Sequence, residues 1–456
     1  MGLVYRNALA NIAATAARDG TVGCFFHRAP NLLEPLVITA KTDNATTHFA
    51  TQSNAPNGLF GAHSPLYQRG WVIQEWYMAP RILHFGRDTV YWECISSAAS
   101  EAFPVMDDSR RTKEVVELLS KASYRNLDAI QSASELMQAW SKLVQVYSKA
   151  QLMHSTDKLP AFSAIACEMA ERWARLCPGE EVTYLAGMWS KFLPQQLLWT
   201  LTRPNNGWST APARPPGRSV APSWSWVSVD MAVHTANWSP LETRAENNLM
   251  DVLESRVSPI GDDPFQEITD GFIRVACFLW KLPRDVMEKC EQCTAQNRIP
   301  ISLSLRYDER ENSLDELLAP RDHVYLAPIL HQYSGGSKPD TSGKLEVRVA
   351  ITGVILARNN NLRGQYIRIG CFALSVREMT SSTLSTGIQG ATADGMWQYE
   401  FNIDAGRFFR MGEGYLEGLG LCGIDESDHE EESEHEKFGR EKVPSFVSHM
   451  FMIKIV

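Results

Sequence analysis

The hydrophobic pattern of this chain changes its period at a Pro/Gly-rich stretch, residues 203–222, which holds PNNGWSTAPARPPGRSVAP. Before it, from about residue 110 to 200, apolar residues recur three and four positions apart, and this spacing is typical of helices. After it, short runs rich in β-forming residues are separated by turn-forming or charged residues, and this pattern predicts strands. The switch separates a helical part of the chain from a β-rich part.

The individual segments can be read from the same patterns. The predicted helices are residues 3–17, which are rich in alanine, and the segments KEVVELLSKA, ELMQAWSKLVQVYSKA, LPAFSAIACEMAERWARL and EVTYLAGMWSKFLPQQLLWTL. The predicted strands of the C-terminal part are SWSWVSVD, GFIRVACFLWKL, VYLAPIL, LEVRVAITGVILAR, QYIRIGCFALS and a closing FVSHMFMIKIV. We therefore expect a first region 1–100, a helical region 101–202, a linker or surface loop 203–222 and a β-rich region 223–456.

The net charge of −9 comes almost entirely from residues 425–436, DESDHEEESEHE, which we expect to be a solvated acidic insert. The rest of the chain is nearly neutral and offers no basic face, so we expect no nucleic-acid partner. No apolar run approaches the ~20 residues that span a bilayer, so we expect no membrane partner. Nine scattered cysteines suit a reducing compartment, and we expect a cytoplasmic protein, with the nucleus as the alternative.

Several residue patterns invite a binding or catalytic interpretation that their surroundings do not support. Cys290 and Cys293 form a CxxC pair, but no second pair completes four zinc ligands, so no metal site is expected. The chain has no phosphate-binding glycine loop and no G-x-S-x-G nucleophile motif. Trp224 and Trp226 could stack on a sugar from one side of a strand, but burial in the core is the favoured interpretation.

The stretch SPLYQRGWVIQEWYMAPRILHFGRDTVYWEC, residues 64–94, carries the strongest candidate site. A helix is predicted from Arg69 to Met78 and should end before Pro80, because the residue before a proline avoids helical geometry. The β-forming runs 82–85 and 89–93 flank a Gly-Arg-Asp turn and predict a hairpin.

Within that helix, Trp71, Glu75 and Met78 should lie on one face. A carboxylate on an otherwise apolar face needs a partner or a raised pKa. We expect Glu75 to form a structural ion pair, and the candidate partners are Arg69, Arg81 and Arg87. The alternative is that Glu75 is an acid that awaits a substrate.

These segments together resemble the fungal heterokaryon-incompatibility (HET) domain family. The family's last block is similar to SPLYQRGWVIQEWYMAPRILHFG followed by YWEC, and the start MGLVYRNALANIAATAARDGTVGCFF resembles the end of its middle block. Further similar segments are STDKLPAFSAIA, YLAGMW, APSWSWVSVD and YIRIG, so the resemblance covers most of residues 1–375. The "ALSYCWG"-like and "WIDALCIIQ"-like segments that open the family pattern are absent. We therefore expect a HET domain that lacks its N-terminal half, with unpaired sheet edges and exposed apolar surface.

The resemblance implies a role in non-self recognition between fungal cells that ends in growth arrest or programmed cell death. The family core is thought to be distantly similar to TIR domains, α/β folds of which some members cleave NAD with a helix glutamate. The implied fold is an incomplete TIR-like α/β core, followed by the helical and β-rich regions. In the enzyme hypothesis Glu75 is catalytic, NAD is the substrate and no metal or cofactor is needed. The residues that would shape this site are Arg69, Gly70, Trp71, Gln74, Pro80 and Arg81.

Two further hypotheses compete with an enzyme. In one, the chain is a non-catalytic module that signals by assembling with other HET-pathway proteins or with itself. In the other, the truncation leaves the chain inactive.

Overall fold

A computed structural model covers the chain. It describes residues 2–27, 36–42, 45–51, 64–101, 130–202, 214, 220–235, 247–282, 293–294, 301–308, 324–335, 344–359, 364–381, 387–388, 399–400 and 451–456. These residues divide into two compact units. Unit 1 comprises Met1–Tyr184 and Pro259–Glu267, and unit 2 comprises Leu185–Ser258 and Ile268–Val456.

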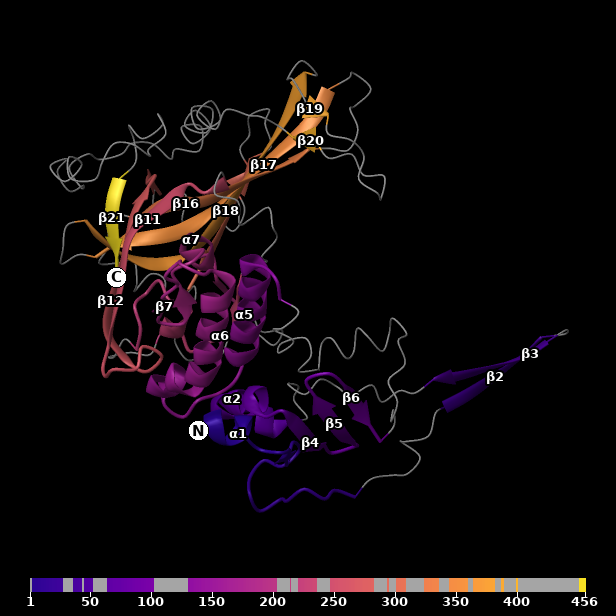
Figure 1. Ribbon diagram of the computed structural model, residues 1–456. Coiled ribbons are helices and arrows are strands. Elements are labelled where there is room, and N and C mark those ends of the chain that lie inside the picture. Colours follow the sequence, from indigo (N-terminus) through magenta and orange to yellow (C-terminus); the bar gives the residue numbers. More distant parts are fainter. Residues whose placement is uncertain are drawn as a thin grey trace. The chain divides into compact units, whose positions relative to one another are not determined.

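Unit 1 contains a four-stranded sheet in the order β1-β4-β5-β6 (Figure 1). The bounds are β1 (Asn11–Ala13), β4 (Arg81–Phe85), β5 (Val90–Cys94) and β6 (Ala98–Ser100). Strand β1 is parallel to β4, and the other neighbours are antiparallel. The hairpin predicted around residues 86–88 is confirmed as β4 and β5. A separate two-stranded sheet pairs β2 (Leu36–Thr42) with β3 (Ala45–Thr51).

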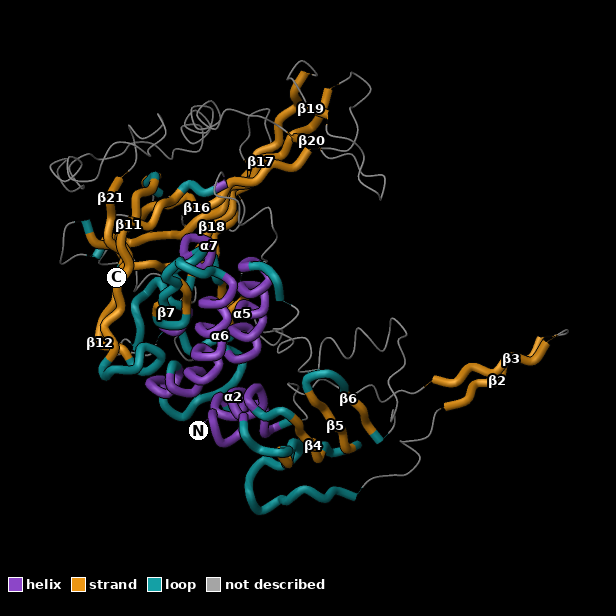
Figure 2. The backbone as a smooth tube through the Cα atoms, viewed as in Figure 1, coloured by secondary structure: helices purple, strands orange, loops and turns teal. Residues whose placement is uncertain are grey.

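The helices of unit 1 are α1 (Gly2–Arg6), α2 (Gly70–Met78), α5 (Ala133–Tyr147) and α6 (Ser163–Leu176), with short 3₁₀ turns η2 (Pro65–Gln68), η4 (Ser155–Lys158) and η5 (Pro160–Phe162). The Ser132 side chain accepts a hydrogen bond from the Glu135 backbone N–H and so caps α5. Helices α5 and α6 lie side by side (Figure 2). Their facing side chains form an apolar core with α2: Ile73, Trp76, Tyr77, Leu136, Trp140, Leu143, Phe162, Ile165, Met169 and Trp173. The predictions for α2, α5 and α6 are confirmed.

The long N-terminal helix predicted for residues 3–17 is wrong. Helix α1 ends at Arg6, and Asn11–Ala13 form β1. The pairing of β1 with β4 is a tertiary contact that overrides the high helix propensity of alanine. Local propensity is a weak guide here, because the partner strand lies about 70 residues further along the chain.

Unit 2 is built on a nine-stranded sheet. Its main path runs β11-β12-β21-β18-β17-β16-β13, and β15 pairs with both β14 and β18. The bounds are β11 (Met250–Pro259), β12 (Ile268–Cys277), β13 (Trp280–Lys281), β14 (Cys293–Thr294), β15 (Ile301–Tyr307), β16 (Val324–Gly335), β17 (Lys344–Arg358), β18 (Gln365–Ser381) and β21 (Phe451–Ile455). Figure 1 shows β17 and β18 as long neighbouring strands. The strands predicted from GFIRVACFLWKL onward are confirmed.

Shorter elements complete unit 2. They are β7 (Tyr184–Leu185), whose first residue belongs to unit 1, β8 (Met188–Trp189), α7 (Leu193–Gln196), β9 (Thr200–Leu201), η6 (Trp226–Ser228), β10 (Val233–His234), β19 (Gly387–Ile388) and β20 (Tyr399–Glu400).

Two predictions for this part of the chain are wrong. The segment 181–201 is not one long helix, because Ala186, Gly187 and Phe192 take positive φ angles of 47°, 90° and 58° and break it into turns. The segment 223–230 is not a strand but contains the 3₁₀ turn η6. Its backbone turns because the Ser225 hydroxyl accepts a hydrogen bond from the Val227 N–H.

The described residues thus form a mixed α/β structure with several sheets, few helices and many strands. Three features predicted from sequence lie outside the described residues: the KEVVELLSKA helix, most of the 203–222 linker and the acidic insert 425–436.

Gly353 of β17 is a position where the sheet has no room for a side chain. It faces Pro328 of β16, and a Cβ atom would collide with the Ala327 carbonyl oxygen and lie 2.6 Å from the Phe372 ring. We predict that Gly353→Ala lowers the free energy of unfolding by about 1–3 kcal/mol, as over-packing does in other cores. Calorimetric unfolding checks this against Gly261→Ala, where nothing lies within 4 Å of the added Cβ and no loss is expected. Equal stability of the two variants would contradict the prediction.

Candidate functional site

Helix α2, which carries the candidate glutamate, is fixed at both ends. The Gly70 N–H donates to the Gln151 carbonyl oxygen at 2.8 Å, and a Cβ at Gly70 would lie 2.5 Å from Leu152. At the other end, Ala79 is extended and Pro80 follows it, so the chain leaves the helix and enters β4. A side chain larger than hydrogen at residue 70 would require the Leu152 side chain to move.

The Glu75 carboxylate is half-buried and is hydrogen-bonded to the Tyr5 side chain of α1. Burial, together with this hydrogen bond and the negative charge of Glu75, raises the pKa of Tyr5 to about 12. Within the part of the chain that the structure describes, no ion pair joins Glu75 to Arg69, Arg81 or Arg87. The predicted arginine partner is therefore wrong, because a phenol takes that place.

The other predicted site residues hold unit 1 together. The Gln74 side-chain oxygen accepts from the Ala164 N–H at 2.8 Å, at the start of α6. The Trp71 indole donates to Asp157 at 3.2 Å, and the Arg81 guanidinium donates to the Leu9 carbonyl oxygen at 3.3 Å. Arg69 is exposed at the start of α2, in a backbone bridge with Gln151. The motif thus connects α2 to several other elements of unit 1.

A buried polar cluster behind α2 was not foreseen from the sequence. The His84 ring lies 2.8 Å from Glu93 through Nε2, and the Trp76 indole donates to the same Glu93 oxygen at 2.5 Å. On its other side, His84 Nδ1 lies 3.0 Å from the Tyr67 hydroxyl and 3.2 Å from the Thr15 hydroxyl. His84 and Glu93 stand on adjacent strands, which is the one local signal that could have revealed the pair.

This hydroxyl–imidazole–carboxylate order matches the order used in nucleophilic catalysis, but the cluster is enclosed. His84 is 0% exposed, Glu93 3% and Tyr67 4%. Burial, and next the charge of Glu93, raises the pKa of Tyr67 well above its usual value, which disfavours the phenolate that would attack a substrate. Glu93 and Tyr67 thus lie at opposite nitrogens of the same imidazole ring. The cluster is a structural network that joins β4 and β5 to α2 through Trp76, and to the Tyr67 and Thr15 hydroxyls.

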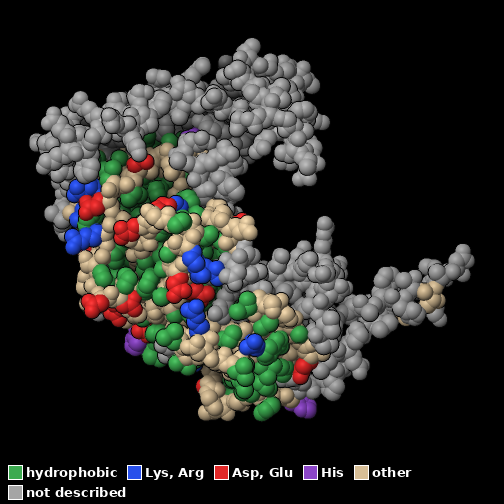
Figure 3. All heavy atoms as spheres, viewed as in Figure 1, with side chains coloured by type: hydrophobic (Ala, Val, Ile, Leu, Met, Phe, Trp, Pro, Cys, Tyr) green, Lys and Arg blue, Asp and Glu red, His purple; other side chains and the backbone are tan. Residues whose placement is uncertain are grey.

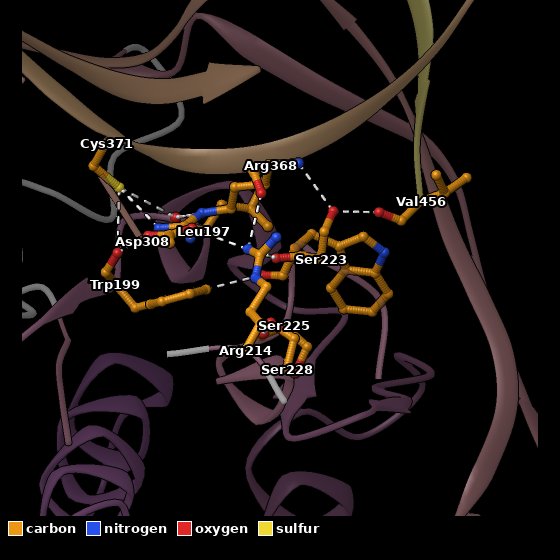
Figure 4. Close-up of polar contacts among 11 residues, drawn as sticks. Leu197, Trp199, Arg214, Ser223, Ser225, Ser228, Asp308, Arg368, Cys371 and Val456 are labelled. Atoms are coloured by element: carbon orange, nitrogen blue, oxygen red, sulfur yellow. Dashed lines mark hydrogen bonds and ion pairs between the residues drawn. The ribbon is translucent and has the colours of Figure 1, made fainter. Parts of the chain in front are cut away.

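Unit 2 has its own buried charged cluster, centred on Arg368 of β18 (Figure 4). The Arg368 guanidinium is paired with Asp308 and donates to the carbonyl oxygens of Leu197 at 3.2 Å and Trp199 at 2.5 Å. It also lies 3.5 Å from the centre of the Trp199 ring, a cation–π contact. Arg214 donates to Asp308 at 3.2 Å, so two guanidinium groups share one buried carboxylate.

The sulfur of Cys371 lies 3.1 Å from Arg368, inside the same cluster. Burial raises the pKa of the Cys371 thiol, and Cys371 is only 6% exposed and lies among backbone carbonyl groups, which suits an inert thiol. The hydrogen bonds from Arg368 hold the 197–199 segment against β18. The cluster contains no accessible nucleophile. None of this was predicted, because the residues lie up to 174 positions apart in the chain.

The tryptophan pair is part of the core of unit 2, which confirms the favoured interpretation. Trp224 is 0% exposed and Trp226 is 3% exposed. The Trp226 indole donates to the Gly187 carbonyl oxygen at 2.8 Å, and the Trp224 carbonyl oxygen accepts from the Trp199 indole at 2.9 Å. No face of either ring is open to a sugar.

For metal binding, the described residues hold no group of three or more His, Cys, Asp or Glu side chains that could bind an ion. Cys290 and the two histidines of the acidic insert lie outside them, and only the backbone of Cys293 is described, in β14.

Comparisons with known proteins return no match: no family model, no curated protein and no solved structure is significantly similar to this chain. In the part of the chain that is described, no helix is both long enough and apolar enough to span a bilayer.

Proposed function

We propose that this chain is a HET-domain protein of the cytoplasm that acts in non-self recognition between fungal cells. In this proposal it acts as a non-catalytic module, and its assembly with partner proteins leads to growth arrest or cell death. The observation that carries the non-catalytic part is the engagement of the motif around Glu75 within unit 1. Glu75 is hydrogen-bonded to Tyr5. The Gln74 side chain accepts a hydrogen bond from the Ala164 N–H at the start of α6, and the Trp71 indole donates one to Asp157.

The arrangement of β1, α2 and β4 supports a relationship to half of a TIR-like α/β core. β1 and β4 are parallel neighbours, and α2 lies on the connection between them. A parallel pair joined through a helix is the repeating unit of α/β folds. Because a fold hosts many functions, this likeness supports the architecture in the proposal and not an activity.

The second candidate function is NAD cleavage with Glu75 as the catalytic group. One observation favours it: Glu75 and Trp71 are the half-buried residues of a helix whose other side chains are buried. Glu75 would then polarise the ribose hydroxyls as nicotinamide leaves, and no metal would be needed. The bond from Tyr5 weighs against it, since a substrate hydroxyl would have to displace the phenol.

A comparison of two variants in a fungal host separates these functions. Glu75→Gln removes the negative charge and keeps the shape, and Tyr5→Phe frees the carboxylate while leaving it charged. If the chain is an assembly module, Glu75→Gln should still cause cell death and the NAD level should stay unchanged. Tyr5→Phe should behave in the same way.

The enzyme function makes the opposite prediction. It requires that NAD falls with the wild-type chain, that Glu75→Gln abolishes both the fall and the cell death, and that Tyr5→Phe preserves or increases them. Thermal unfolding of both variants controls for misfolding. If the wild-type chain causes neither death nor growth arrest, the proposed role in recognition is contradicted.

A further inference from the structure

Strand β11 lies at one end of the main path of the unit 2 sheet, and among the described residues it pairs with β12 only. Just before it, Asn248 forms a bridge with Leu330, and the Leu249 N–H donates to the Ile329 carbonyl oxygen at 2.8 Å. The chain then leaves β16 and continues as β11 for ten residues, whereas strands usually have about five or six. A long edge strand of this kind offers backbone N–H and C=O groups to another strand.

The middle of β11 carries exposed side chains of three kinds. Leu253 is 51% exposed, the Glu254 side chain is 50% exposed, and Arg256 is exposed as well. Because side chains two positions apart point to the same face of a strand, Glu254 and Arg256 lie on one face, with Ser255 between them. Figure 3 shows basic and acidic side chains close together on the surface where Figure 1 places β11 and β12.

The charges of β11 are only weakly engaged within the sheet. The Glu254 carboxylate lies 4.0 Å from Arg274 Nε of β12, and both side chains are partly exposed. An ion pair that is this long and open to water contributes little to stability. The Glu254 carboxylate can therefore accept a second guanidinium from outside the sheet.

The order Glu254-Ser255-Arg256 makes this edge complementary to itself. If two copies of β11 pair antiparallel about a two-fold axis at Ser255, Glu254 of each copy lies opposite Arg256 of the other, and Leu253 lies opposite Val257. An axis at residue 254 would place two glutamates directly opposite each other, and an axis at residue 256 would do the same with two arginines. Like charges in directly opposite positions are destabilising, so the charges select one register.

We propose that β11 binds β11 of a second copy of this chain, as an antiparallel two-fold pair centred on Ser255. Backbone hydrogen bonds and the Leu253–Val257 contacts supply the affinity. The two Glu254–Arg256 pairs fix the register, and the same charges disfavour other strands at this edge. This inference rests on the proposed assembly function and names a second copy of the chain as a partner.

Charge exchange tests the proposal on the full chain, by analytical ultracentrifugation over a range of concentrations. The wild-type chain should show a reversible equilibrium between monomer and dimer. Glu254→Arg and Arg256→Glu should each raise the dissociation constant of the dimer about tenfold or more, because each brings like charges together at two places in the dimer.

An equimolar mixture of the two variants should dimerise again, since every opposing pair then has opposite charges. The double variant Glu254→Arg/Arg256→Glu should dimerise as the wild type does, for the same reason. Asp262→Arg, at an exposed carboxylate outside β11, should leave the dissociation constant unchanged. Because the exchanged side chains are exposed, thermal unfolding should be unchanged in all variants, and calorimetry checks this.

Three results would overturn the proposal: a wild-type chain that is monomeric at every concentration, a dimer that neither single variant weakens, or folded variants whose mixture stays monomeric. A dimer that Asp262→Arg weakens equally would also overturn it, because net charge and not the register would then control association. If one single variant is destabilised, the double variant decides the question. Failure of dimerisation leaves the cell-death and NAD results untouched, so the two proposals fail separately.

Discussion

Asp308→Ala is expected to destabilise unit 2 by about 3–5 kcal/mol, the range found when one partner of a buried ion pair is removed. Asp308 is 1% exposed and accepts from both Arg368 and Arg214. Without it, the Arg368 guanidinium, also 1% exposed, keeps its charge in a site that water does not reach. Arg214 is partly exposed, so its charge can be hydrated at lower cost.

The measurement is urea or thermal unfolding followed through tryptophan fluorescence, because Trp199 stacks on Arg368 and should report the local change. Asp251→Ala, an exposed carboxylate of the same unit, is the matched control, with an expected change within about 0.5 kcal/mol. The double variant Asp308→Ala/Arg368→Met should recover part of the loss, since it removes the uncompensated charge as well. If Asp308→Ala is no less stable than Asp251→Ala, the cluster does not stabilise unit 2 as described.

Glu93→Ala is the second large expected effect, in unit 1. Glu93 accepts hydrogen bonds from Trp76 and His84 in a site where all three side chains are almost fully buried. Its removal leaves two buried donors without this acceptor, and each unsatisfied donor costs about 1–3 kcal/mol of stability. We therefore expect the free energy of unfolding to fall by about 2–6 kcal/mol.

Two further variants define this result. Glu93→Gln keeps an acceptor oxygen, so it should lower the free energy of unfolding clearly less than Glu93→Ala does. Glu181→Ala, at an exposed carboxylate of the same unit, should be close to neutral. Equal losses in Glu93→Gln and Glu93→Ala would show that the negative charge, and not the acceptor oxygen, is the stabilising feature.

Elements with strong local signals were predictable from the sequence. Helix α2 was predicted almost to the residue, since Gly70 opens it and Pro80 follows it. The β4–β5 hairpin was predicted from its Gly-Arg-Asp turn, and β16 to β18 from their runs of β-forming residues. In each of these cases the local preference and the tertiary contacts favour the same structure.

The failures occurred where distant contacts override local preference. Residues 11–13, which lie in an alanine-rich stretch, form a strand because β4 pairs with them. The backbone at Ala186 and Phe192 adopts left-handed geometry that helical spacing cannot anticipate. Glu75 was expected to pair with an arginine close in sequence, but its partner Tyr5 lies 70 positions earlier. Pairings of this separation carry no local signal, and the same holds for the Asp308 cluster, whose residues lie up to 174 positions apart.

We propose that Glu75 has a structural role and that the chain does not cleave NAD. The most direct test is to incubate the purified chain with NAD and to measure released nicotinamide, with Glu75→Gln in parallel. The account predicts that neither protein releases nicotinamide above the rate of NAD alone, while Glu75→Gln alters thermal stability through the Tyr5 contact. Nicotinamide release by the wild-type chain that Glu75→Gln abolishes, with its fold intact, would contradict the account.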